Sequence, residues 1–413
     1  MGYSLLQSLT GIENNYTLTT ALSDLVNLRL IKEEKPAKRY TIHRLVARVR
    51  RFENPLAGRK EWQQKIVGKL VEWFRERKDD FKYLAEFENE TIHLQQWQSQ
   101  SVAVLPIETV YLTNFEAYPL WHRGNYQESK ILLEKALNLY QENQLNDEKL
   151  LAHLYNDLAV IAERLGSFNQ AFEFFQKALS IGRNVFDEKN EDIARFLNNL
   201  SSSYNNLGNH QKALEVNEQA LKIYQELFGE KHPDIADSLN NVGSTYNYLG
   251  NYQKALELNE QALKMRQELF DKKHPNIANS LSNLGTNYDY LGNHLKALES
   301  NEQAFKMRQE LFGEKHPSIA DSLNNLGATY YYLGNYPKAV NFYESALKMY
   351  QELLGEKHPN TILACGNLIL ALSELGKREQ AGRLAGDFLS YVPQNHHKRW
   401  LFEKYGAAYQ KAR

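Results

Sequence analysis

The chain has 413 residues, of which 42% are hydrophobic and 24% charged, and its formal net charge at pH 7 is −1. A nearly neutral chain has no general attraction for nucleic acid or anionic lipid, and no stretch approaches the roughly 20 apolar residues that span a bilayer. The first residues lack the basic and apolar regions of a secretory signal, and the single cysteine, Cys365, excludes an internal disulfide framework, so we expect no membrane partner and a cytoplasmic location.

The first predicted elements are a helix, a hairpin and a second helix. Residues 17–31 have the spacing of an amphipathic helix. The turn-rich residues 32–39 and the strand-like residues 40–42 follow, and another helix is expected from His43 onward. This order predicts a small winged-helix domain over residues 1–55.

The charge of this domain raises the question of DNA binding. Between Arg29 and Lys60 there are eleven Lys or Arg residues against three Glu. The exposed face of the helix over residues 17–31, however, carries Asp24, and its one cation is Arg29. A helix that enters the major groove normally brings Arg or Lys to bases and phosphates. We therefore expect nucleic acid not to be a partner, and DNA binding is kept as the alternative.

The predicted domain contains the segments L-x-x-L-V-N-L-R-L-I, from Leu22, and Y-T-I-H-R-L-V, from Tyr40. These two segments resemble the winged helix of the NB-ARC class of signal-transduction ATPases. In that family a histidine at the position of His43 contacts the nucleotide diphosphate, so the resemblance implies a cofactor-binding role for His43. Arg44 stands where many members have Asp, and the sequence has no G-x-x-x-x-G-K-[ST] loop. His43 is then either a structural residue at a helix start or a contact to a separate nucleotide-binding polypeptide.

An aromatic-rich segment separates this domain from the rest of the chain. Trp62, Trp73 and Phe87 belong to a pattern with helical spacing. Part of this segment also resembles the helical bridge of the same ATPase class. We therefore predict a helical bridge or cap over residues 56–106, which protects the following helices from water.

The rest of the chain is a repeat. The dipeptide Leu-Gly begins at residues 165, 207, 249, 291, 333 and 375, a constant spacing of 42 residues. A fixed period of this length indicates one supersecondary unit that is copied and stacked, so that each copy covers its neighbour's apolar face.

One copy predicts a helical hairpin. The apolar residues from Ile235 to Leu249 fall at helical spacing and predict a first helix, here called helix A. Pro233 fits the first turn of helix A, and Gly250 supplies a left-handed residue after its end. Helix B follows, and Gly243 on helix A is small where the two helices are expected to cross.

The repeat resembles the tetratricopeptide repeat in its 42-residue form, as in kinesin light chains. The resemblance rests on Gly243, Tyr246, Gly250, Ala255 and Ala262, each of which recurs in neighbouring copies. It implies an all-α, right-handed superhelix, or α-solenoid, of about seven helix pairs over residues 107–391. A C-terminal capping helix is expected over residues 392–413.

The sequence departs from that family at one position of helix B. Asn217, Asn259 and Asn301 stand where the family usually has an aromatic residue, which Phe175 and Tyr343 keep. A buried amide without a partner costs roughly 1–3 kcal/mol. These asparagines therefore either form a structural ladder or contact a ligand.

Patterns of catalytic and metal-binding residues are absent from the sequence. His232, His274, His316 and His358 each precede a proline. Because successive copies are expected to be separated by two helix widths, each about 8–10 Å, these histidines cannot share a zinc ion, which holds nitrogen at ~2.1 Å. The sequence has no H-E-x-x-H, C-x-x-C or G-x-S-x-G motif. We expect neither an enzyme nor a metal or cofactor requirement.

Polar and aromatic residues recur on helix A and predict a peptide-binding site in the concave groove. An asparagine side chain can pair with a peptide N–H and C=O together, and tyrosine adds apolar area and a hydroxyl. Recent duplication of near-identical copies could equally produce the recurrence. The candidate peptide-binding residues are Asn198, Asn199, Asn240, Asn241, Asn283, Asn324, Asn325, Ser244, Tyr248, Tyr290 and Tyr332.

These observations predict a non-enzymatic scaffold or ligand sensor that binds an extended, internal peptide segment of a protein partner. The NB-ARC resemblance suggests the sensor half of such a signalling system. The alternative is a transcriptional regulator whose winged helix binds DNA under the control of peptide binding, and a secreted effector is a third interpretation. Replacement of Asn241, Asn283 and Asn325 by alanine is expected to abolish partner capture with little change in melting temperature.

Overall fold

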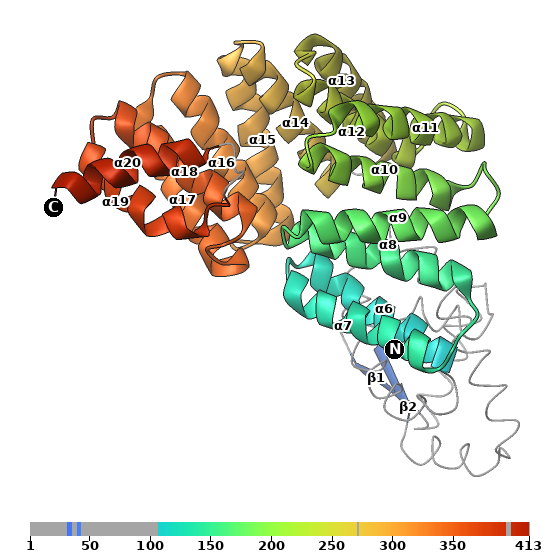
Figure 1. The fold of residues 1–413 in the computed structure, drawn as a ribbon. Coiled ribbons are helices and arrows are strands. Elements are labelled where there is room, and N and C mark those ends of the chain that lie inside the picture. Colours follow the sequence, from blue (N-terminus) through green and yellow to red (C-terminus); the bar gives the residue numbers. More distant parts are fainter. Residues whose placement is uncertain (1–30, 35–38, 43–105, 271, 394–397, 413) are drawn as a thin grey trace, which may run out of the picture. The chain divides into compact units, whose positions relative to one another are not determined.

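A computed structural model describes residues 31–34, 39–42, 106–270, 272–393 and 398–412 (Figure 1). The chain divides into two compact units, 1–154 and 155–413. The boundary falls inside helix α8 (Glu148–Arg164).

The described part of the first unit contains a strand pair and helices. Strands β1 (Ile31–Glu34) and β2 (Arg39–Ile42) are antiparallel, with Ile31 opposite Ile42. This hairpin lies where the wing was predicted, but β1 begins at Ile31, inside the segments expected to be helix and turn. Two β-branched residues at opposed positions favour a strand pair there. The flanking helices of the predicted winged helix, the bridge and His43 lie outside the described residues.

The remaining described elements are helical. Their bounds are α6 Pro106–His122, α7 Tyr126–Glu142, α8 Glu148–Arg164, α9 Phe168–Val185, α10 Glu191–Asn206, α11 His210–Phe228, α12 Pro233–Tyr248, α13 Tyr252–Leu269, α14 Pro275–Tyr290, α15 His294–Phe312, α16 Pro317–Tyr332, α17 Tyr336–Leu354, α18 Pro359–Glu374, α19 Arg378–Phe388, the 3-10 helix η2 Leu389–Tyr391 and α20 Arg399–Ala412.

The second unit stacks helical hairpins of the predicted kind. Pro233 begins α12, and Gly250 follows the end of that helix with φ of 77°, so both predicted helix signals are confirmed. The same pattern recurs in α14 and α16, and each of these A helices packs on the B helix that follows it. Successive A helices, from α10 to α18, also contact one another directly (Figure 1). The core therefore lies between the A and B layers, and the A helices form a layer of their own.

A close approach inside one hairpin accounts for an unexpected asparagine. A Cβ atom added to Gly285 of α14 would lie 2.3 Å from Oδ1 of Asn301 on α15. The Asn301 amide also donates to Thr329 Oγ1 of α16 at 3.0 Å. In the next hairpin Gly327 makes the same approach to Tyr343. The glycine thus creates space for the helix B residue, whether it is an amide or an aromatic ring.

Replacement of Gly285 by alanine is expected to destabilise the second unit by about 2 kcal/mol. Overpacking costs about 1–3 kcal/mol and the displaced amide loses a bond of about 1 kcal/mol, whereas the better helix propensity of alanine returns about 1 kcal/mol. Urea unfolding followed by circular dichroism measures the change. The double variant Gly285→Ala, Asn301→Ala should be more stable than the sum of the single effects predicts, and simple additivity would contradict the proposed clash.

The histidines that precede proline are helix caps. Nδ1 of His274 accepts from the backbone N–H of Asn276 at 3.1 Å, and the same bond recurs at His232, His316 and His358. The His274 ring also stacks on Phe270, with centroids 3.9 Å apart. At the start of α10, Asn190 takes the cap position and accepts from Asp192 N–H at 2.8 Å. A cap needs an acceptor, so these imidazoles act in the neutral form.

Acid is expected to weaken the His232 cap. Burial lowers the pKa of His232, so the unfolded chain takes up the proton more readily than the folded chain. The contribution of the His232 cap to the free energy of unfolding is therefore present above the unfolded pKa and is lost as pH falls below it. His232→Asn, which copies Asn190, should match the native chain at pH 7. At pH 5 it should be more stable by up to about 1 kcal/mol, the usual value of a cap, and less if protonated His232 pairs with Asp234. Chemical denaturation at both pH values measures this difference, and an equal change in both proteins would contradict the cap assignment.

Candidate functional site

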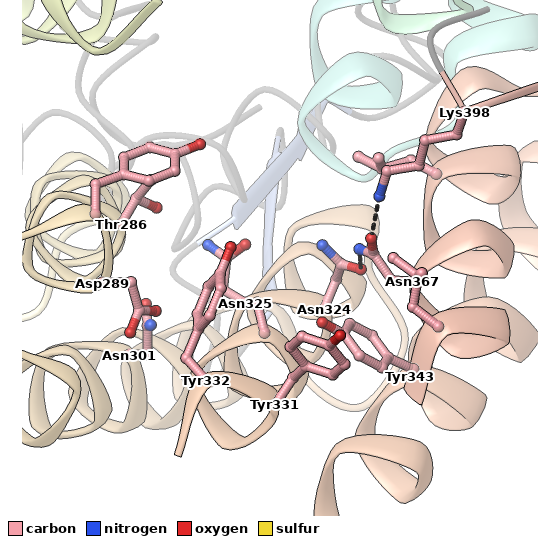
Figure 2. Close-up of a pocket in the computed structure, with 14 residues that line it drawn as sticks. Thr286, Asp289, Asn301, Asn324, Asn325, Tyr331, Tyr332, Tyr343, Asn367 and Lys398 are labelled. Carbon is pink, nitrogen blue, oxygen red and sulfur yellow. Dashed lines mark hydrogen bonds between the residues drawn. The ribbon is translucent and has the colours of Figure 1, made fainter. Parts of the chain in front are cut away.

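The exposed face of the A helices contains a cavity of about 370 Å³ near the end of the second unit (Figure 2). Helices α14, α16 and α18 supply most of its walls, because these three A helices are neighbours in the stack. The lining residues are Thr286, Asp289, Tyr290, Asn301, Asn324, Asn325, Ala328, Tyr331, Tyr332, Tyr343, Leu363, Asn367, Leu370 and Lys398. Four of the predicted peptide-binding residues, Tyr290, Asn324, Asn325 and Tyr332, thus lie at one cavity.

Three predicted tyrosines form an exposed column on successive A helices. Tyr248, Tyr290 and Tyr332 are 57%, 49% and 51% exposed. Burial by the surrounding protein nevertheless raises the pKa of each phenol. We call Tyr248, Tyr290 and Tyr332 the tyrosine column.

Each ring of the tyrosine column is held by an aromatic residue at the start of the preceding B helix. Tyr248 stacks on His210, and the ring centroids are 4.9 Å apart at an interplanar angle of 3°. Tyr290 stacks on Tyr252 at 4.7 Å. Tyr332 stacks on His294 at 5.4 Å. The three rings therefore present the same kind of surface once per repeat.

The second asparagine of each pair forms a half-buried amide column, which comprises Asn199, Asn241, Asn283, Asn325 and Asn367. Asn283 donates to Asn240 Oδ1 of the preceding helix at 3.3 Å, and Asn325 donates to Ser282 Oγ at 2.9 Å. Asn199 and Asn367 make the corresponding bonds to Asn156 and Asn324. Each such bond uses one of the two amide hydrogens, so it orients the side chain and leaves capacity for a ligand.

The first asparagine of two pairs has a different position from the one predicted. Asn198 and Asn240 are only 6% and 4% exposed. Asn198 donates to Ser238 Oγ at 2.6 Å, and Asn240 donates to Ser280 Oγ at 3.3 Å, in both cases on the next A helix. Both amides therefore make contacts between hairpins, because the direct packing of A helices covers them.

The remaining predicted residues are arranged as follows. Asn241 and Ser244 on α12 are half-buried. Five of the predicted residues do not line the cavity, namely Asn199, Asn241, Asn283, Ser244 and Tyr248. Of the two interpretations of the helix B asparagines, the structure favours the ladder between hairpins for Asn217 and Asn259, whereas Asn301 bonds to the next A helix and also lines the cavity. Asn217 and Asn259 are fully buried and bond to Thr245 and Asn287 of the next A helix at 3.0 and 2.7 Å.

A lysine that the sequence did not single out lies at the cavity. Lys398 Nζ donates to Asn367 Oδ1 at 2.5 Å, and Asn367 in turn donates to Asn324 Oδ1 at 2.9 Å (Figure 2). Burial lowers the pKa of Lys398 to about 8. The carboxylate in the lining, Asp289, accepts from Thr329 at 2.6 Å and lies 3.0 Å from His294 Nδ1. Lys398 lies outside the 42-residue period, so the repeat pattern gave no signal for it.

Sequence reasoning also missed a column of buried side chains between the hairpins. Arg266 on α13 donates to Ser280 Oγ and Asp237 Oδ1, both at 2.5 Å. Arg308 occupies the same register on α15, and Tyr350 does so on α17. The sequence did contain a signal for this column. Tyr350 occupies the repeat position that Arg266 and Arg308 occupy in their copies, and a tyrosine at that position suggests burial.

Within the described ranges, no three metal-ligating side chains cluster together. In the same ranges, no helix is both long enough and apolar enough to cross a bilayer.

Comparisons with known proteins agree with this geometry. The sequence model of the tetratricopeptide repeat family matches residues 116–184, 192–268, 242–310, 276–352 and 318–385, which together cover more than half of the chain. No curated protein sequence matches the chain.

The solved structures that resemble the fold include the following three. NprR in complex with its cognate peptide NprX has a TM-score of 0.52 and 13% identity, with 81% of this chain and 98% of that chain covered. A Rap protein complexed with competence and sporulation factor has a TM-score of 0.51 and 18% identity, with coverage of 80% and 97%. A STAND protein with a tetratricopeptide repeat sensor, from Pyrococcus horikoshii, has a TM-score of 0.51 and 19% identity. That match covers all of this chain and 63% of the Pyrococcus protein.

Proposed function

This chain belongs to the tetratricopeptide repeat family, and we propose that it binds an extended peptide segment of a protein partner along the tyrosine and amide columns of its A helices. The cavity at Tyr290, Tyr332 and Asn325 carries this proposal. It combines half-exposed rings, which gain from burial against a ligand, with oriented amides that can pair with a peptide backbone. That NprR holds its peptide NprX supports the proposal, because a helix array of similar fold can accept such a ligand.

Lys398 modifies the expected ligand. The sequence predicted an extended, internal peptide segment as the ligand. The structure adds one ammonium group, that of Lys398, beside Asn367. An ammonium group is a donor with three hydrogens, so a peptide carbonyl or carboxylate fits beside it. Lys398 therefore adds a charged hydrogen-bond donor at the Asn367 end of the amide column.

We also propose that the bound peptide acts as a signal, so that the chain is a sensor and not only a scaffold. The resemblance of residues 22–46 to the NB-ARC winged helix supports a signalling role in which a separate polypeptide supplies the nucleotide-binding half. The similarity of the fold to a STAND protein with a repeat sensor is in line with this role. Co-purification of the full chain with a nucleotide-binding partner, in a peptide-dependent amount, is the expected behaviour.

Peptide binding is tested by selection from a phage-displayed library of random 12-residue peptides on the immobilised full chain. The double variant Tyr290→Ser, Tyr332→Ser should bind the selected peptides at least about 30-fold more weakly, because two aromatic contacts of about 1 kcal/mol or more are lost. Fluorescence anisotropy of labelled peptide gives the dissociation constants.

The matched control is Leu295→Ser on α15. Leu295 is a strongly exposed apolar side chain that does not line the cavity, so its removal should leave affinity unchanged. Equal affinity of the native chain and the tyrosine variant would show that the peptides bind elsewhere.

A further inference from the structure

The spacing of the tyrosine column restricts the conformation of a peptide that could contact every ring. Tyr248, Tyr290 and Tyr332 occupy one register of three successive A helices. These helices contact each other directly, and helices in contact lie about 8–10 Å apart. A ligand that meets each ring in the same way must therefore repeat its own structure about every 8–10 Å.

Among regular backbone conformations, polyproline II fits this requirement. It has three residues per turn and rises 3.1 Å per residue, so the same face returns after about 9 Å. An extended strand also advances about 10 Å in three residues, but its side chains alternate between faces and the third residue points away. Identical contacts to successive rings thus select a three-residue period.

The hydrogen-bond donors on the A helices also favour a ligand in the polyproline II conformation. A polyproline II backbone has no internal hydrogen bonds, so all of its carbonyl groups can accept from protein donors. The amide column supplies such donors on the same A helices as the rings, and Lys398 adds one beside Asn367. An α-helical ligand has a comparable seven-residue repeat of about 10.5 Å, but its carbonyl groups are used internally, so it offers the amide column no backbone acceptors.

The stacking of the three tyrosine rings also fits a polyproline II ligand. Each tyrosine stacks on a residue of the preceding B helix, which keeps its outer face turned in a fixed direction. Proline-rich segments in the polyproline II conformation are recognised by grooves lined with aromatic side chains. Proline also lowers the entropy that the ligand loses on binding, because its backbone is already restricted.

We propose that the ligand of these repeats is a proline-rich segment in the polyproline II conformation, with one proline-centred turn against each tyrosine of the column. This proposal rests on the proposed peptide-binding function and specifies the class of peptide. It places three consecutive turns, about nine residues, across α12, α14 and α16.

Two display libraries of 12-residue peptides test the proposal on the immobilised full chain. One library fixes proline at every third position, and the matched library fixes alanine at the same positions. The proline library should yield at least tenfold more binding clones. In the tightest clone, moving the prolines from a spacing of three to a spacing of two residues should weaken binding at least tenfold, with anisotropy as the readout.

Each other outcome overturns the proposal, and the outcomes separate it from the function on which it rests. Equal yields from both libraries, or better binders from the alanine library, would show that the chain binds peptides of another class. Binders that Tyr290→Ser, Tyr332→Ser retains would place the proline-rich segment away from the tyrosine column. Absence of binders from both libraries would contradict peptide binding itself.

Discussion

Replacement of Arg308 by alanine is expected to lower the free energy of unfolding of the second unit by about 3 kcal/mol. Arg308 is 5% exposed and donates to Ser318 O at 3.0 Å, Ser322 Oγ at 2.7 Å and Asn279 Oδ1 at 2.9 Å. Alanine would remove a long buried side chain and leave three acceptors without this donor. A lost hydrogen bond is worth about 1 kcal/mol and a buried cavity adds to that.

The Arg308→Ala substitution should also change how cooperatively the array of hairpins unfolds. Arg308 lies on α15, whereas two of its acceptors belong to α16 and the third to α14. In a repeat array, stability is approximately a sum of repeat terms and nearest-neighbour interface terms. Weakening this interface should therefore broaden or split the urea transition, and hydrogen exchange should become faster in α16–α20 than in α10–α13. A single, equally steep transition at the native midpoint would contradict this role.

The neighbouring repeats provide a matched control for Arg308. Tyr350 has the same register on α17, and its hydroxyl donates to Asp321 Oδ1 at 2.6 Å. Arg308→Tyr combined with Asn279→Asp copies that pair into the preceding interface. The double variant should unfold within about 1 kcal/mol of the native chain, although it removes the same charge as Arg308→Ala. Burial lowers the pKa of Arg308, which indicates that the charge itself is held at a cost.

Replacement of Asn241, Asn283 and Asn325 by alanine is expected to weaken peptide binding about 100-fold or more. Each amide is taken to make one hydrogen bond of about 1 kcal/mol to the ligand backbone, and about 1.4 kcal/mol corresponds to a factor of ten. Anisotropy with a peptide from the random display library measures the change. Affinity within a factor of three of the native value would remove the amide column from the binding site.

The structure changes one part of this expectation. The sequence suggested that the triple variant would keep its melting temperature, but Asn283 and Asn325 each bond to the preceding A helix. We therefore expect a loss of stability of about 1–2 kcal/mol along with the loss of binding. The matched control is Asn217→Ala, Asn259→Ala, which removes two buried amides between hairpins. That variant should lose at least as much stability and keep its affinity.

The hairpins could be predicted from local signals. Pro233 and Gly250 mark the two ends of α12 because their backbone preferences act within a few residues, and the 42-residue period carries this information to every copy. Gly243 also marked the place where the two helices cross, since a residue without a side chain lets their backbones approach closely.

The site was only partly predictable, because it depends on how neighbouring hairpins pack. Asn240 and Asn241 are adjacent and chemically identical, yet one lies between A helices and the other at their exposed side. About 100° of helical rotation separates them, and the position of the boundary is set by the approach of α14. Arg308 was missed because a long cation on an amphipathic helix usually faces solvent.

The most direct test of peptide binding by the A helices is a crystal structure of the full chain with the tightest peptide selected from the random library. The peptide backbone is expected to lie along the tyrosine column, with its carbonyl or N–H groups about 3 Å from the amides of Asn283, Asn325 and Asn367. A peptide bound to the B helices or to the loops, with these amides still facing water, would contradict the account.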